Sequence, residues 1–477
     1  MIIVESFAGQ NVIVLGLGRT GKAAARAIQA GGGNVYAWDD NSLLRTEARN
    51  ADIQVMDPLR LDWKTIAVLV MSPGIPHTFP EPHPVAAKAR NAGVPIVSDV
   101  DLLGRTQTAA KYIGITGTNG KSTTTSLIGH ILKKTHQNVE VGGNIGIPSL
   151  TLEPLDADGI YVLEMSSFLN ELTRSIRFDA AVLLNITPDH IDRHGSMEGY
   201  VAAKELIFQN QKPGSIAIVG MDDARSMRIY HRLKNNSHTK VVGISARKAI
   251  KGGIYYKDGL LIDDAFSQQA IVLDARKGTK FILGLHWQSV CAAYAVARHF
   301  GVSRPMILES METFEGMDHR QQYIATIDDV LYINDSKATN MASAKEALNT
   351  FQDIFWILGG RMKGESLSSL SDYFPKVKKA FLIGEAIDSF ASVFTSAGVP
   401  YEESGDLEQA VLDARRAALS SECANPTVLL SPACASFDQF DNFEERGKLF
   451  CKVVLELPGL RLHREDKEQK TSFLEVI

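Results

Sequence analysis

Short apolar runs alternate along this chain with amphipathic stretches whose apolar positions recur every three or four residues. The beginning of the chain shows the pattern, with an apolar run at 11–15, an Ala-rich helical stretch at 23–30 and a second run at 34–40 that ends in acids. Runs of about five residues suit buried strands, whereas the wider spacing lines one face of a helix. The pattern therefore predicts an α/β fold built from strand–helix units.

Three consecutive segments of the chain show this alternation. Further strands are predicted at 67–71 and 95–97 in the first segment, at 113–116, 160–163 and 180–184 in the second, and at 331–333, 354–358 and 428–430 in the third. Gly and Asp turn signals between short apolar runs at 252–273 indicate a small antiparallel element. We therefore expect three α/β domains, at 1–107, 108–315 and 316–477, because domains of about 150 residues are usual.

The most specific signal is a glycine-rich turn between a predicted strand and a predicted helix. It has the sequence Gly117-Thr118-Asn119-Gly120-Lys121-Ser122-Thr123. Backbone N–H groups of such a turn wrap a phosphate, and the helix N-terminus adds partial positive charge. Lys121 would reach the β- and γ-phosphates, and Ser122 or Thr123 would hold Mg²⁺. The turn departs from a strict Walker A motif, since Ile115 stands at the first glycine position, and an ordinary tight turn is the alternative; the order of strand, motif and helix favours nucleotide binding.

A second glycine motif follows the first predicted strand. Gly16-Leu17-Gly18-Arg19-Thr20-Gly21 has G-x-G-x-x-G spacing, and Asp39 lies about 20 residues beyond it, as in dinucleotide-binding units. On the residues alone the motif fits three uses equally: binding a dinucleotide such as NAD, binding another nucleotide diphosphate, or close packing of helix on strand. Asp39 could accept a hydrogen bond from a ribose or base, or could cap a turn.

A carboxylate directly follows the predicted strand at 160–163. This residue is Glu164. A carboxylate after a buried strand, beside a phosphate-binding turn, is a usual ligand of Mg²⁺. The sequence therefore favours a metal role for Glu164 over that of a solvated turn residue.

Two histidines after the strand at 180–184 raise the possibility of zinc. His190 and His194 are four residues apart, but the zinc-protease pattern requires Glu after the first His, where Ile191 stands. Flanking Pro188 and Gly195 favour a loop. His190 is therefore expected to serve Mg²⁺ or a substrate phosphate rather than zinc, with a hydrogen-bonded loop histidine as the equal alternative.

Cations and one carboxylate stand at predicted strand ends in the last third of the chain. They are His319, Arg320, Asp335, Lys337 and Lys363. Each alone is typical of a solvated surface, but their shared placement indicates the cationic clamp that phosphoryl transfer needs. The small-residue turn Ser431–Ser436 either exposes N–H groups to a carboxylate or packs tightly.

Composition narrows the classes of function. The net charge of −5 gives no basic footprint for nucleic acid. No apolar run approaches the ~18 residues of a membrane span, and the N-terminus lacks the pattern of a secretory signal. The four cysteines show no CxxC spacing, which favours reduced thiols. We therefore expect a cytoplasmic protein that binds neither nucleic acid nor membrane.

Together these motifs resemble the Mur ligase superfamily, and within it the D-glutamate-adding branch. The resemblance covers essentially the whole chain and rests on Gly16–Gly21, Ser72–Ile75, Gly117–Thr123, Gly142–Gly146, Leu163–Phe168, Asn185–Arg193, Asn334–Asn340 and Leu430–Phe440 with Asn442-Phe443. It implies a Rossmann-like N-terminal domain that binds the UDP part of a substrate, a central P-loop-type ATPase sheet domain, and a Rossmann-like C-terminal domain that receives D-glutamate. The first glycine motif then serves a nucleotide diphosphate rather than NAD.

The resemblance also implies a reaction. It is ATP-dependent amide formation in the synthesis of the cell-wall precursor of peptidoglycan, carried out by a monomer with Mg²⁺. The carboxylate of UDP-N-acetylmuramoyl-L-alanine would attack the γ-phosphate of ATP, and the amine of D-glutamate would then attack the resulting acyl phosphate.

Roles follow by resemblance for residues at matching positions. ATP contacts are Gly117, Thr118, Asn119, Gly120, Lys121, Ser122, Thr123, Arg320, Asp335 and Lys337; the catalytic set is Lys121, Glu164, His190 and Lys204; and the metal set is Ser122, Thr123, Glu164, His190 and Lys204. Substrate contacts are Thr20, Asp39, Ser72, Asn144 and Ser166 for the UDP-linked acceptor, and Thr339, Lys363, Ser436 and Phe443 for D-glutamate. Lys204 would act as a carbamate, which turns a cation into an anionic metal ligand. The residues alone would leave Lys204 a solvated helix residue.

One segment departs from the family pattern. The family usually has Gly-x-His-Asn-x-x-Asn before an Ala-rich helix, whereas this chain has Gly284-Leu285-His286-Trp287-Gln288-Ser289. Both asparagines, which contact the adenine side of ATP in the family, are missing, so Gln288 or Ser289 would have to substitute. Rival hypotheses are an NAD-dependent dehydrogenase, a nucleotide-sensing binding protein and a folylpolyglutamate-type ligase.

Overall fold

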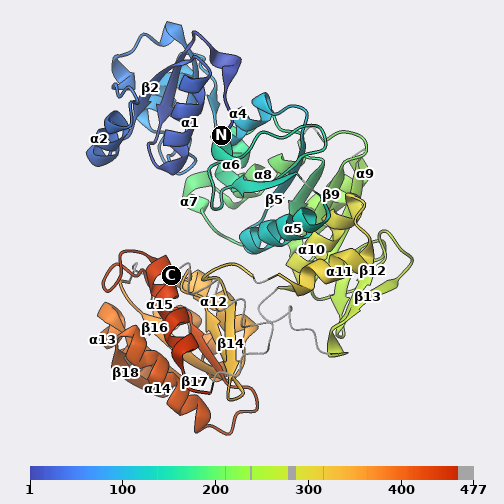
Figure 1. Ribbon diagram of the computed structural model, residues 1–477, viewed down its shortest axis with the longest axis vertical. Helices are drawn as coiled ribbons and strands as arrows, with labels where there is room; N and C mark the ends of the chain where they lie inside the picture. Colours follow the sequence, from blue (N-terminus) through green and yellow to red (C-terminus); the bar gives the residue numbers. More distant parts are fainter. Residues whose placement is uncertain are drawn as a thin grey trace. The chain divides into compact units, whose positions relative to one another are not determined.

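The structure, a computed structural model, describes residues 1–136, 138–209, 211–236, 239–277, 286–314, 316–362, 364 and 366–459. Within these residues the chain forms three sheets interleaved with helices (Figure 1). The described residues divide into two compact units, one ending at Phe314 and one starting at Gly316. The predicted fold class, α/β with three sheet-containing domains, is confirmed. Lys363 and the Gly284-Leu285 pair of the divergent segment lie outside the described residues.

The N-terminal sheet is parallel, with strand order β2-β1-β3-β4. Its strands are β1 (Asn11–Leu15), β2 (Asn34–Trp38), β3 (Ile66–Met71) and β4 (Ile96–Val97), and its helices are α1 (Arg19–Ala30), α2 (Ser42–Asn50), α3 (Pro84–Asn91) and α4 (Asp99–Thr106). The four strands predicted from sequence match these within two residues at each end. Parallel strands are covered on both faces, so they form continuous apolar runs that sequence analysis finds readily.

The central sheet places β5 between β7 and β8, in the order β13-β12-β11-β10-β9-β8-β5-β7-β6. Its strands are β5 (Lys111–Thr116), β6 (Val139–Gly143), β7 (Ile160–Glu164), β8 (Ala180–Leu183), β9 (Ile216–Gly220), β10 (Lys240–Ser245), β11 (Ile254–Lys257), β12 (Leu260–Asp263) and β13 (Ala270–Asp274). Its helices are α5 (Lys121–Thr135), α6 (Ser167–Leu172), α7 (Ile191–His194), α8 (Met197–Glu205), α9 (Ala224–Asn236), α10 (Trp287–His299) and α11 (Arg304–Glu312). The antiparallel pairs β11–β12 and β12–β13 confirm the small antiparallel element predicted at 252–273.

The N-terminal and central sheets belong to one compact unit. A single cluster of buried apolar side chains runs from Ile2 to Tyr255. Backbone hydrogen bonds add to it, from Ile2 N to Leu150 O at 2.8 Å and from Ser98 N to Leu172 O at 3.0 Å. The division of this unit into domains at 107/108 therefore stays a prediction.

The C-terminal sheet is an open α/β sheet with strand order β14-β15-β19-β16-β17-β18, antiparallel only at β14. Its strands are β14 (Gln322–Ile327), β15 (Val330–Asn334), β16 (Ile354–Gly359), β17 (Val377–Ile383), β18 (Tyr401–Gly405) and β19 (Thr427–Leu430). Helices α12 (Met341–Thr350) and α13 (Ile387–Ala397) with the 3₁₀ segment η8 (Leu367–Lys376) pack in one apolar cluster, and α14 (Leu407–Leu419) and α15 (Phe443–Glu456) in another. Helices therefore cover both faces.

Two further observations bear on the sequence analysis. The segment expected to be a loop between Pro188 and Gly195 contains one helical turn, α7 (Ile191–His194). It is preceded by His190 in a left-handed conformation (φ 51°) and followed by Gly195 (φ 75°). Among the described residues, no helix is long and apolar enough to cross a membrane.

Candidate functional site

The predicted glycine-rich turn joins β5 to α5 in the central sheet, which confirms the order of strand, turn and helix. Gly120 caps α5 in a left-handed conformation (φ 80°). A Cβ atom at Gly117 (φ 158°) would lie 3.0 Å from Leu184 Cβ. Glycine is therefore required at Gly120 by backbone conformation, and Gly117 lies in a tightly packed position. The turn leads into the N-terminus of the 15-residue helix α5, and a helix N-terminus favours an anion.

Asn185, two residues beyond the end of β8, is hydrogen-bonded to this turn. Asn119 N donates to Asn185 Oδ1 at 2.9 Å, and Asn185 Nδ2 donates to Asn119 O at 3.2 Å. Asn185 Nδ2 also donates to Oε1 of buried Gln288, at 2.9 Å. The first turn of α10 is thereby connected to the glycine-rich turn. Gln288 is one of the two residues proposed to substitute for the missing asparagines, and it contacts Asn185, which is itself hydrogen-bonded to the turn.

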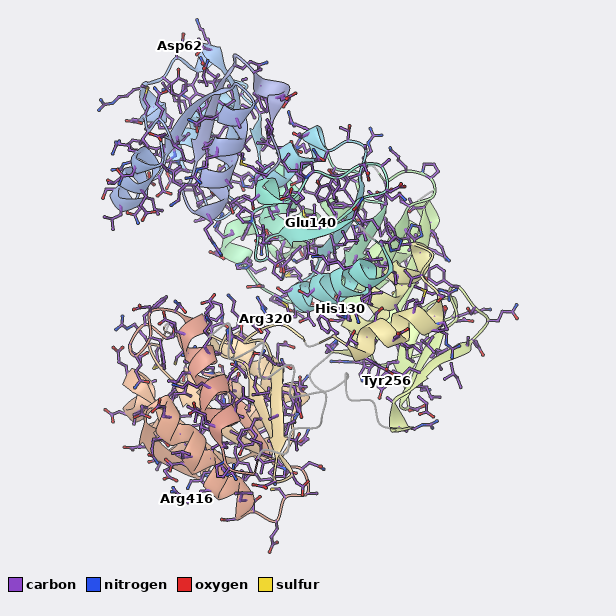
Figure 2. The ribbon with its side chains drawn as sticks, viewed as in Figure 1. Asp62, His130, Glu140, Tyr256, Arg320 and Arg416 are labelled. Carbon is purple, nitrogen blue, oxygen red and sulfur yellow. The ribbon has the colours of Figure 1, made fainter. Side chains whose placement is uncertain are left out.

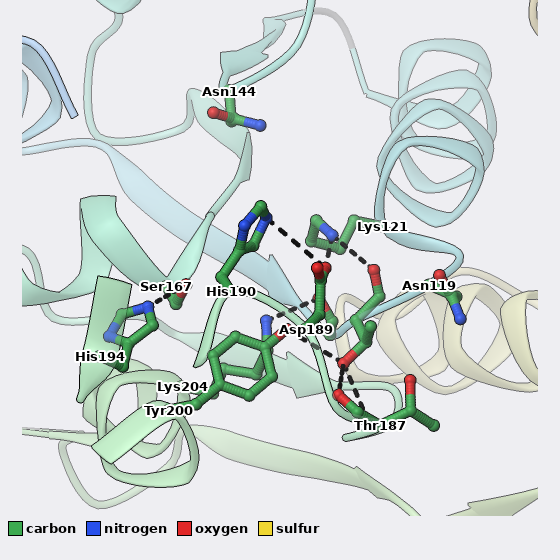
Figure 3. Close-up of polar contacts among 12 residues, drawn as sticks. Asn119, Lys121, Asn144, Ser167, Thr187, Asp189, His190, His194, Tyr200 and Lys204 are labelled. Atoms are coloured by element: carbon green, nitrogen blue, oxygen red, sulfur yellow. Dashed lines mark hydrogen bonds and ion pairs between the residues drawn. The ribbon is translucent and has the colours of Figure 1, made fainter. Parts of the chain in front are cut away.

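Thr118, within the turn, forms a second set of contacts. Its hydroxyl donates to Thr187 O (3.1 Å), accepts from Thr187 N (3.0 Å) and contacts the Tyr200 hydroxyl at 3.1 Å. Figure 3 shows these contacts beside the side chains of Lys121 and Lys204. The turn is therefore pre-ordered by side chains from the β8 end and from α8.

Two lysines converge on the carbonyl groups of the turn. Lys121 Nζ donates to Gly117 O at 2.9 Å and to Thr118 O at 2.8 Å. Lys204 Nζ, from α8, donates to Gly117 O at 2.7 Å. Lys121, the cation predicted for a phosphate site, therefore lies against the turn, and the amine of Lys204 shares its acceptor Gly117 O.

Lys204 is only 2% exposed, contrary to the solvated position its sequence context suggests. Burial lowers the pKa of Lys204 well below its usual value, and the charge of Lys121 lowers it further, against the opposing effects of Asp189 and Glu164. Its ammonium position lies 4.6 Å from the centre of the Tyr200 ring. Burial disfavours the charged form of this amine, and a neutral amine is a nucleophile.

Glu164 is the last residue of β7 and is 3% exposed. Its Oε1 accepts from Asn144 Nδ2 at 3.0 Å, and Asn144 N donates to Glu164 O at 2.9 Å. Its Oε2 is buried and has no hydrogen-bond partner in the described chain. A buried carboxylate oxygen without a partner costs free energy, so this atom fits a cation supplied from outside the chain.

The two histidines of the 185–194 segment have separate surroundings. His190 is exposed, with Nε2 3.5 Å from Asp189 Oδ2. His194 is buried, with Nε2 2.9 Å from Ser167 Oγ and Nδ1 3.5 Å from Glu171 Oε1. The two imidazoles therefore contact different partners, and the role of His190 stays a prediction.

The donors predicted for Mg²⁺ are mostly oxygen atoms. Among the described residues, no group of three or more His, Cys, Asp or Glu side chains could hold a metal ion. The predicted set instead combines one carboxylate and one imidazole with the hydroxyls of Ser122 and Thr123 in the first turn of α5 and with Lys204. Oxygen donors suit Mg²⁺, and the unpaired Oε2 of Glu164 fits it.

The N-terminal glycine motif has a packing explanation. A Cβ atom at Gly21 would overlap Gly16 O, and one at Gly16 would overlap the Ser72 hydroxyl. Ser72 Oγ itself lies 3.5 Å from Gly16 O, and Thr20 stands half-buried in the first turn of α1. The close-packing use of the motif is therefore observed, while its use for a nucleotide stays a prediction.

Asp39 has a structural task of its own. Its Oδ2 accepts from Leu17 N at 2.7 Å, within the glycine motif, and its Oδ1 accepts from Asn41 N at 2.8 Å. Both oxygens therefore stabilise turns, as the capping alternative proposed. Ser166 likewise caps α6, accepting from Leu169 N at 3.2 Å.

In the second unit, predicted residues meet where β15 and β19 end. Asp335 Oδ2 accepts from Ser431 Oγ at 2.8 Å, and Ser336 Oγ donates to Phe443 O at 2.8 Å. Lys337 Nζ lies 3.7 Å from the centre of the Phe443 ring. The three segments that carry the predicted Asp335, Lys337, Thr339, Ser436 and Phe443 are thereby connected. Arg320, labelled in Figure 2, is exposed.

Arg446, on α15, is a residue that sequence analysis missed. It is 1% exposed and donates to Ser336 Oγ (3.0 Å), Ser336 O (2.9 Å) and Cys434 O (3.1 Å). Burial lowers the pKa of its guanidinium to about 10. An arginine in the first turns of an amphipathic helix gives no sequence signal that distinguishes it from a solvated charge.

Asp335 gives a prediction about pH. Burial raises its pKa to about 7, from 3.8. A raised carboxyl pKa stabilises the fold at low pH and loses that contribution as pH rises through 7. We expect Asp335→Asn to be more stable than wild type at pH 8, and this difference to shrink by on the order of 2 kcal/mol at pH 5. Thermal unfolding of the full chain at both pH values measures it.

Asp329, an exposed aspartate six residues earlier in the chain than Asp335, provides the control. Asp329→Asn keeps a residue that tolerates its left-handed conformation (φ 63°) and should show no pH-dependent difference. An Asp335→Asn difference that is equal at pH 5 and pH 8 would contradict the raised pKa.

Comparisons with known proteins agree with this geometry. The Mur ligase middle domain matches residues 115–275, and the Mur ligase glutamate ligase domain matches residues 319–434. A protein of Rhodospirillum rubrum named UDP-N-acetylmuramoylalanine–D-glutamate ligase is 44% identical over 467 residues, covering 97% of this chain and 98% of that protein. The chain belongs to the Mur ligase family. A Caulobacter vibrioides protein of the same name is 45% identical to this Mur ligase over 462 residues, covering 95% and 97%.

Solved structures show the same fold. The UDP-N-acetylmuramate-alanine ligase MurC of Thermotoga maritima matches this Mur ligase with a TM-score of 0.56 at 15% identity, covering 94% of this chain and 99% of that one. A UDP-N-acetylmuramoyl-L-alanyl-D-glutamate–2,6-diaminopimelate ligase matches with a TM-score of 0.53 at 17% identity, covering 94% and 93%. At these identities the likeness concerns the fold.

Proposed function

We propose that this protein is an ATP-dependent ligase that joins D-glutamate to UDP-N-acetylmuramoyl-L-alanine in peptidoglycan precursor synthesis. Relatives named for this reaction support it, because they are 44% and 45% identical over nearly the full length of the chain. The observation that carries the proposal is the convergence of Lys121 and Lys204 on the turn after β5. Two amines beside an anion-binding turn suit chemistry that activates a carboxylate with a phosphoryl group.

The reaction balances in two steps. A carboxylate oxygen of the acceptor attacks the γ-phosphorus of ATP, the bond to the β–γ bridging oxygen breaks, and ADP leaves. The amine of D-glutamate then attacks the carbonyl carbon of the acyl phosphate. The amine loses a proton, and the tetrahedral intermediate expels inorganic phosphate to leave the amide.

The chain would assist the first step with the turn Gly117–Thr123. Its N–H groups would hold the triphosphate, and Lys121 would move from the carbonyls of Gly117 and Thr118 to the phosphate oxygens. Ser122, Thr123, Glu164 and His190 would hold Mg²⁺. Bound Mg²⁺ neutralises phosphate charge.

We propose that Lys204 carries a carbamate. The neutral amine would attack CO₂, forming an N–C bond and releasing one proton, to give an anion in place of a cation. Burial supports this because it lowers the pKa of Lys204 and so favours the neutral amine. The modified side chain would add an oxygen donor beside Glu164 and would relieve the repulsion between Lys204 and Lys121.

The remaining assignments follow the family resemblance. The UDP-linked acceptor would be contacted by Thr20, Asp39, Ser72, Asn144 and Ser166. The side chains of Asp39 and Ser166 accept hydrogen bonds from backbone N–H groups, which would hold them in place for this contact. Arg320, Asp335 and Lys337 would contact the nucleotide, and Thr339, Lys363, Ser436 and the Phe443 backbone would receive D-glutamate. The protein would act in the cytoplasm as a monomer.

We also propose that Gln288 replaces part of what the missing asparagines do. Its contact with Asn185 ties α10 to the glycine-rich turn. The neighbouring Trp287 ring stacks on Tyr256 of β11, with centroids 3.7 Å apart; Tyr256 is labelled in Figure 2. The first residues of α10 are therefore held beside the turn, and an adenine could pack against them.

An assay of D-glutamate-dependent ADP release tests the function. Purified full-length protein is given ATP, Mg²⁺ and UDP-N-acetylmuramoyl-L-alanine with either enantiomer of glutamate. We expect ADP release with the D enantiomer and little with the L enantiomer. Absence of ADP release would favour a binding protein, and turnover of NADH would favour a dehydrogenase.

Glu164→Gln should lower kcat by about a hundredfold and raise the Mg²⁺ concentration needed for half-maximal rate. Gln keeps an Oε1 acceptor for Asn144 Nδ2, so the change removes charge at Oε2 while the local fold is preserved. Initial rates over a Mg²⁺ titration measure it. The exposed Glu153 provides the control, and Glu153→Gln should behave as wild type. An unchanged Mg²⁺ requirement in Glu164→Gln would remove Glu164 from the metal set.

A further inference from the structure

A cavity lies in the first unit, lined by residues other than those of the glycine-rich turn. Its volume is about 510 Å³, within the usual range for small-molecule sites. One wall is β4 with residues that precede and follow it, and the other is the end of α6 with Leu206. β4 pairs only with β3 in the described sheet, so it is an edge strand and its other side borders the cavity.

The two walls are fixed to each other by specific contacts. Ser98 Oγ and Thr173 Oγ1 lie 2.9 Å apart. The buried carboxylate of Asp101 accepts from the backbone N–H groups of Arg174 and Ser175, both at 2.7 Å. Its other oxygen accepts from Arg105 Nε at 2.8 Å. The cavity is therefore a formed feature of the fold.

The lining of the cavity combines an apolar floor with a cationic rim. Leu172 and Val97 are buried in the floor, and Arg90, Arg105 and Arg174 stand around it. Asp101 compensates Arg105. In the part of the chain that the structure describes, no hydrogen bond or ion pair is formed by the guanidinium of Arg90 or of Arg174.

One acidic side chain, Glu171, lines the cavity and lies beside two imidazoles. Glu171 places Oε2 3.7 Å from His77 Nε2 and Oε1 3.5 Å from His194 Nδ1. Neither Glu171 Oε2 nor His194 Nδ1 has a hydrogen-bond partner among the described residues, and burial lowers the pKa of His77. Glu171 therefore sets one negative charge against the two positive charges of Arg90 and Arg174. The uncompensated charge of the cavity is positive, which favours an anion.

We propose that this cavity binds a small organic dianion, with an apolar body against Leu172 and Val97 and with phosphate or carboxylate oxygens between Arg90 and Arg174. Guanidinium groups present paired donors that match both anions. A ligand here would touch the N-terminal and central sheets together and would therefore stabilise their contact. Neither arginine belongs to the residues proposed for catalysis or substrate binding.

Fluorescence titration of the full-length protein tests the proposal. The probes are 1-naphthyl phosphate, 1,4-naphthalenedicarboxylate and neutral 1-naphthalenemethanol, which share an apolar body. We expect saturable binding of at least one dianion, at least tenfold tighter than the neutral compound. Saturating ATP or UDP should leave it unchanged. Which dianion binds will identify the anionic group.

Variants locate the site. The double variant Arg90→Gln/Arg174→Gln should bind the dianion at least tenfold more weakly, because charge-assisted hydrogen bonds each contribute about that factor. It should keep the wild-type KM for ATP and for UDP-N-acetylmuramoyl-L-alanine. The control Arg49→Gln/Arg228→Gln changes exposed arginines on α2 and α9 and should bind as wild type. Absence of saturable binding, displacement by ATP or UDP, or unchanged affinity in the Arg90/Arg174 variant would each overturn the proposal.

Discussion

Lys204→Ala should abolish ligase turnover, lowering kcat by roughly a thousandfold or more. The reason is chemical. The proposed carbamate would place an anion from α8 beside the glycine-rich turn, where unmodified Lys204 places an amine. Lys204→Arg sharpens the test. Arginine keeps a cation and a donor for Gly117 O but does not form a carbamate, so it should be as inactive as alanine.

Labelling separates a carbamate from a purely structural lysine. With ¹³C-bicarbonate, wild type should give a carbamate carbon signal by NMR that is missing in Lys204→Ala. Lys212→Ala, a change of an exposed lysine, should keep both the signal and the activity. Near-normal turnover by Lys204→Arg, or a signal that survives in Lys204→Ala, would remove the carbamate from the account.

Lys121→Ala should have an effect of similar size, with ADP release in the presence of D-glutamate falling by about a thousandfold. The ammonium is tethered to Gly117 O and Thr118 O by two hydrogen bonds, next to the place where phosphate oxygens would lie. Without the Lys121 ammonium, the N–H groups of the turn are the main remaining source of positive charge beside the phosphate oxygens. The KM for ATP should also rise.

Lys111→Ala is the matched control, because Lys111 is the exposed first residue of β5, which leads to the same turn. It should retain wild-type rates, and thermal unfolding should show that both variants fold. D-glutamate-dependent ADP release by Lys121→Ala at close to the wild-type rate would place the triphosphate elsewhere.

Much of the fold was predictable from local pattern. Strands such as β1 and β16 are buried along almost their whole length, so each is a continuous apolar run in sequence. The edge strand β18 was not predicted, because its residues Tyr401–Gly405 are half-exposed and polar. The glycine-rich turn was found for a physical reason: an anion-binding turn needs glycine at fixed offsets from a strand and a helix.

The environment of the site could not be predicted from the residues. Lys204 is buried because α8 packs under a turn that lies 87 residues earlier in the chain. Arg446 and Gln288 are likewise fixed by partners distant in sequence, at Ser336 and Asn185. Asp39 holds a turn together, which is one of the two roles that the sequence left open for it. Such contacts depend on tertiary packing, which one sequence does not reveal.

The transfer of oxygen tests the central claim most directly. UDP-N-acetylmuramoyl-L-alanine with both carboxylate oxygens labelled as ¹⁸O is converted with ATP and D-glutamate, and the released phosphate is analysed by mass spectrometry. An acyl-phosphate route predicts one ¹⁸O atom in each inorganic phosphate and one in each amide. Unlabelled phosphate, with its new oxygen taken from water, would contradict the account.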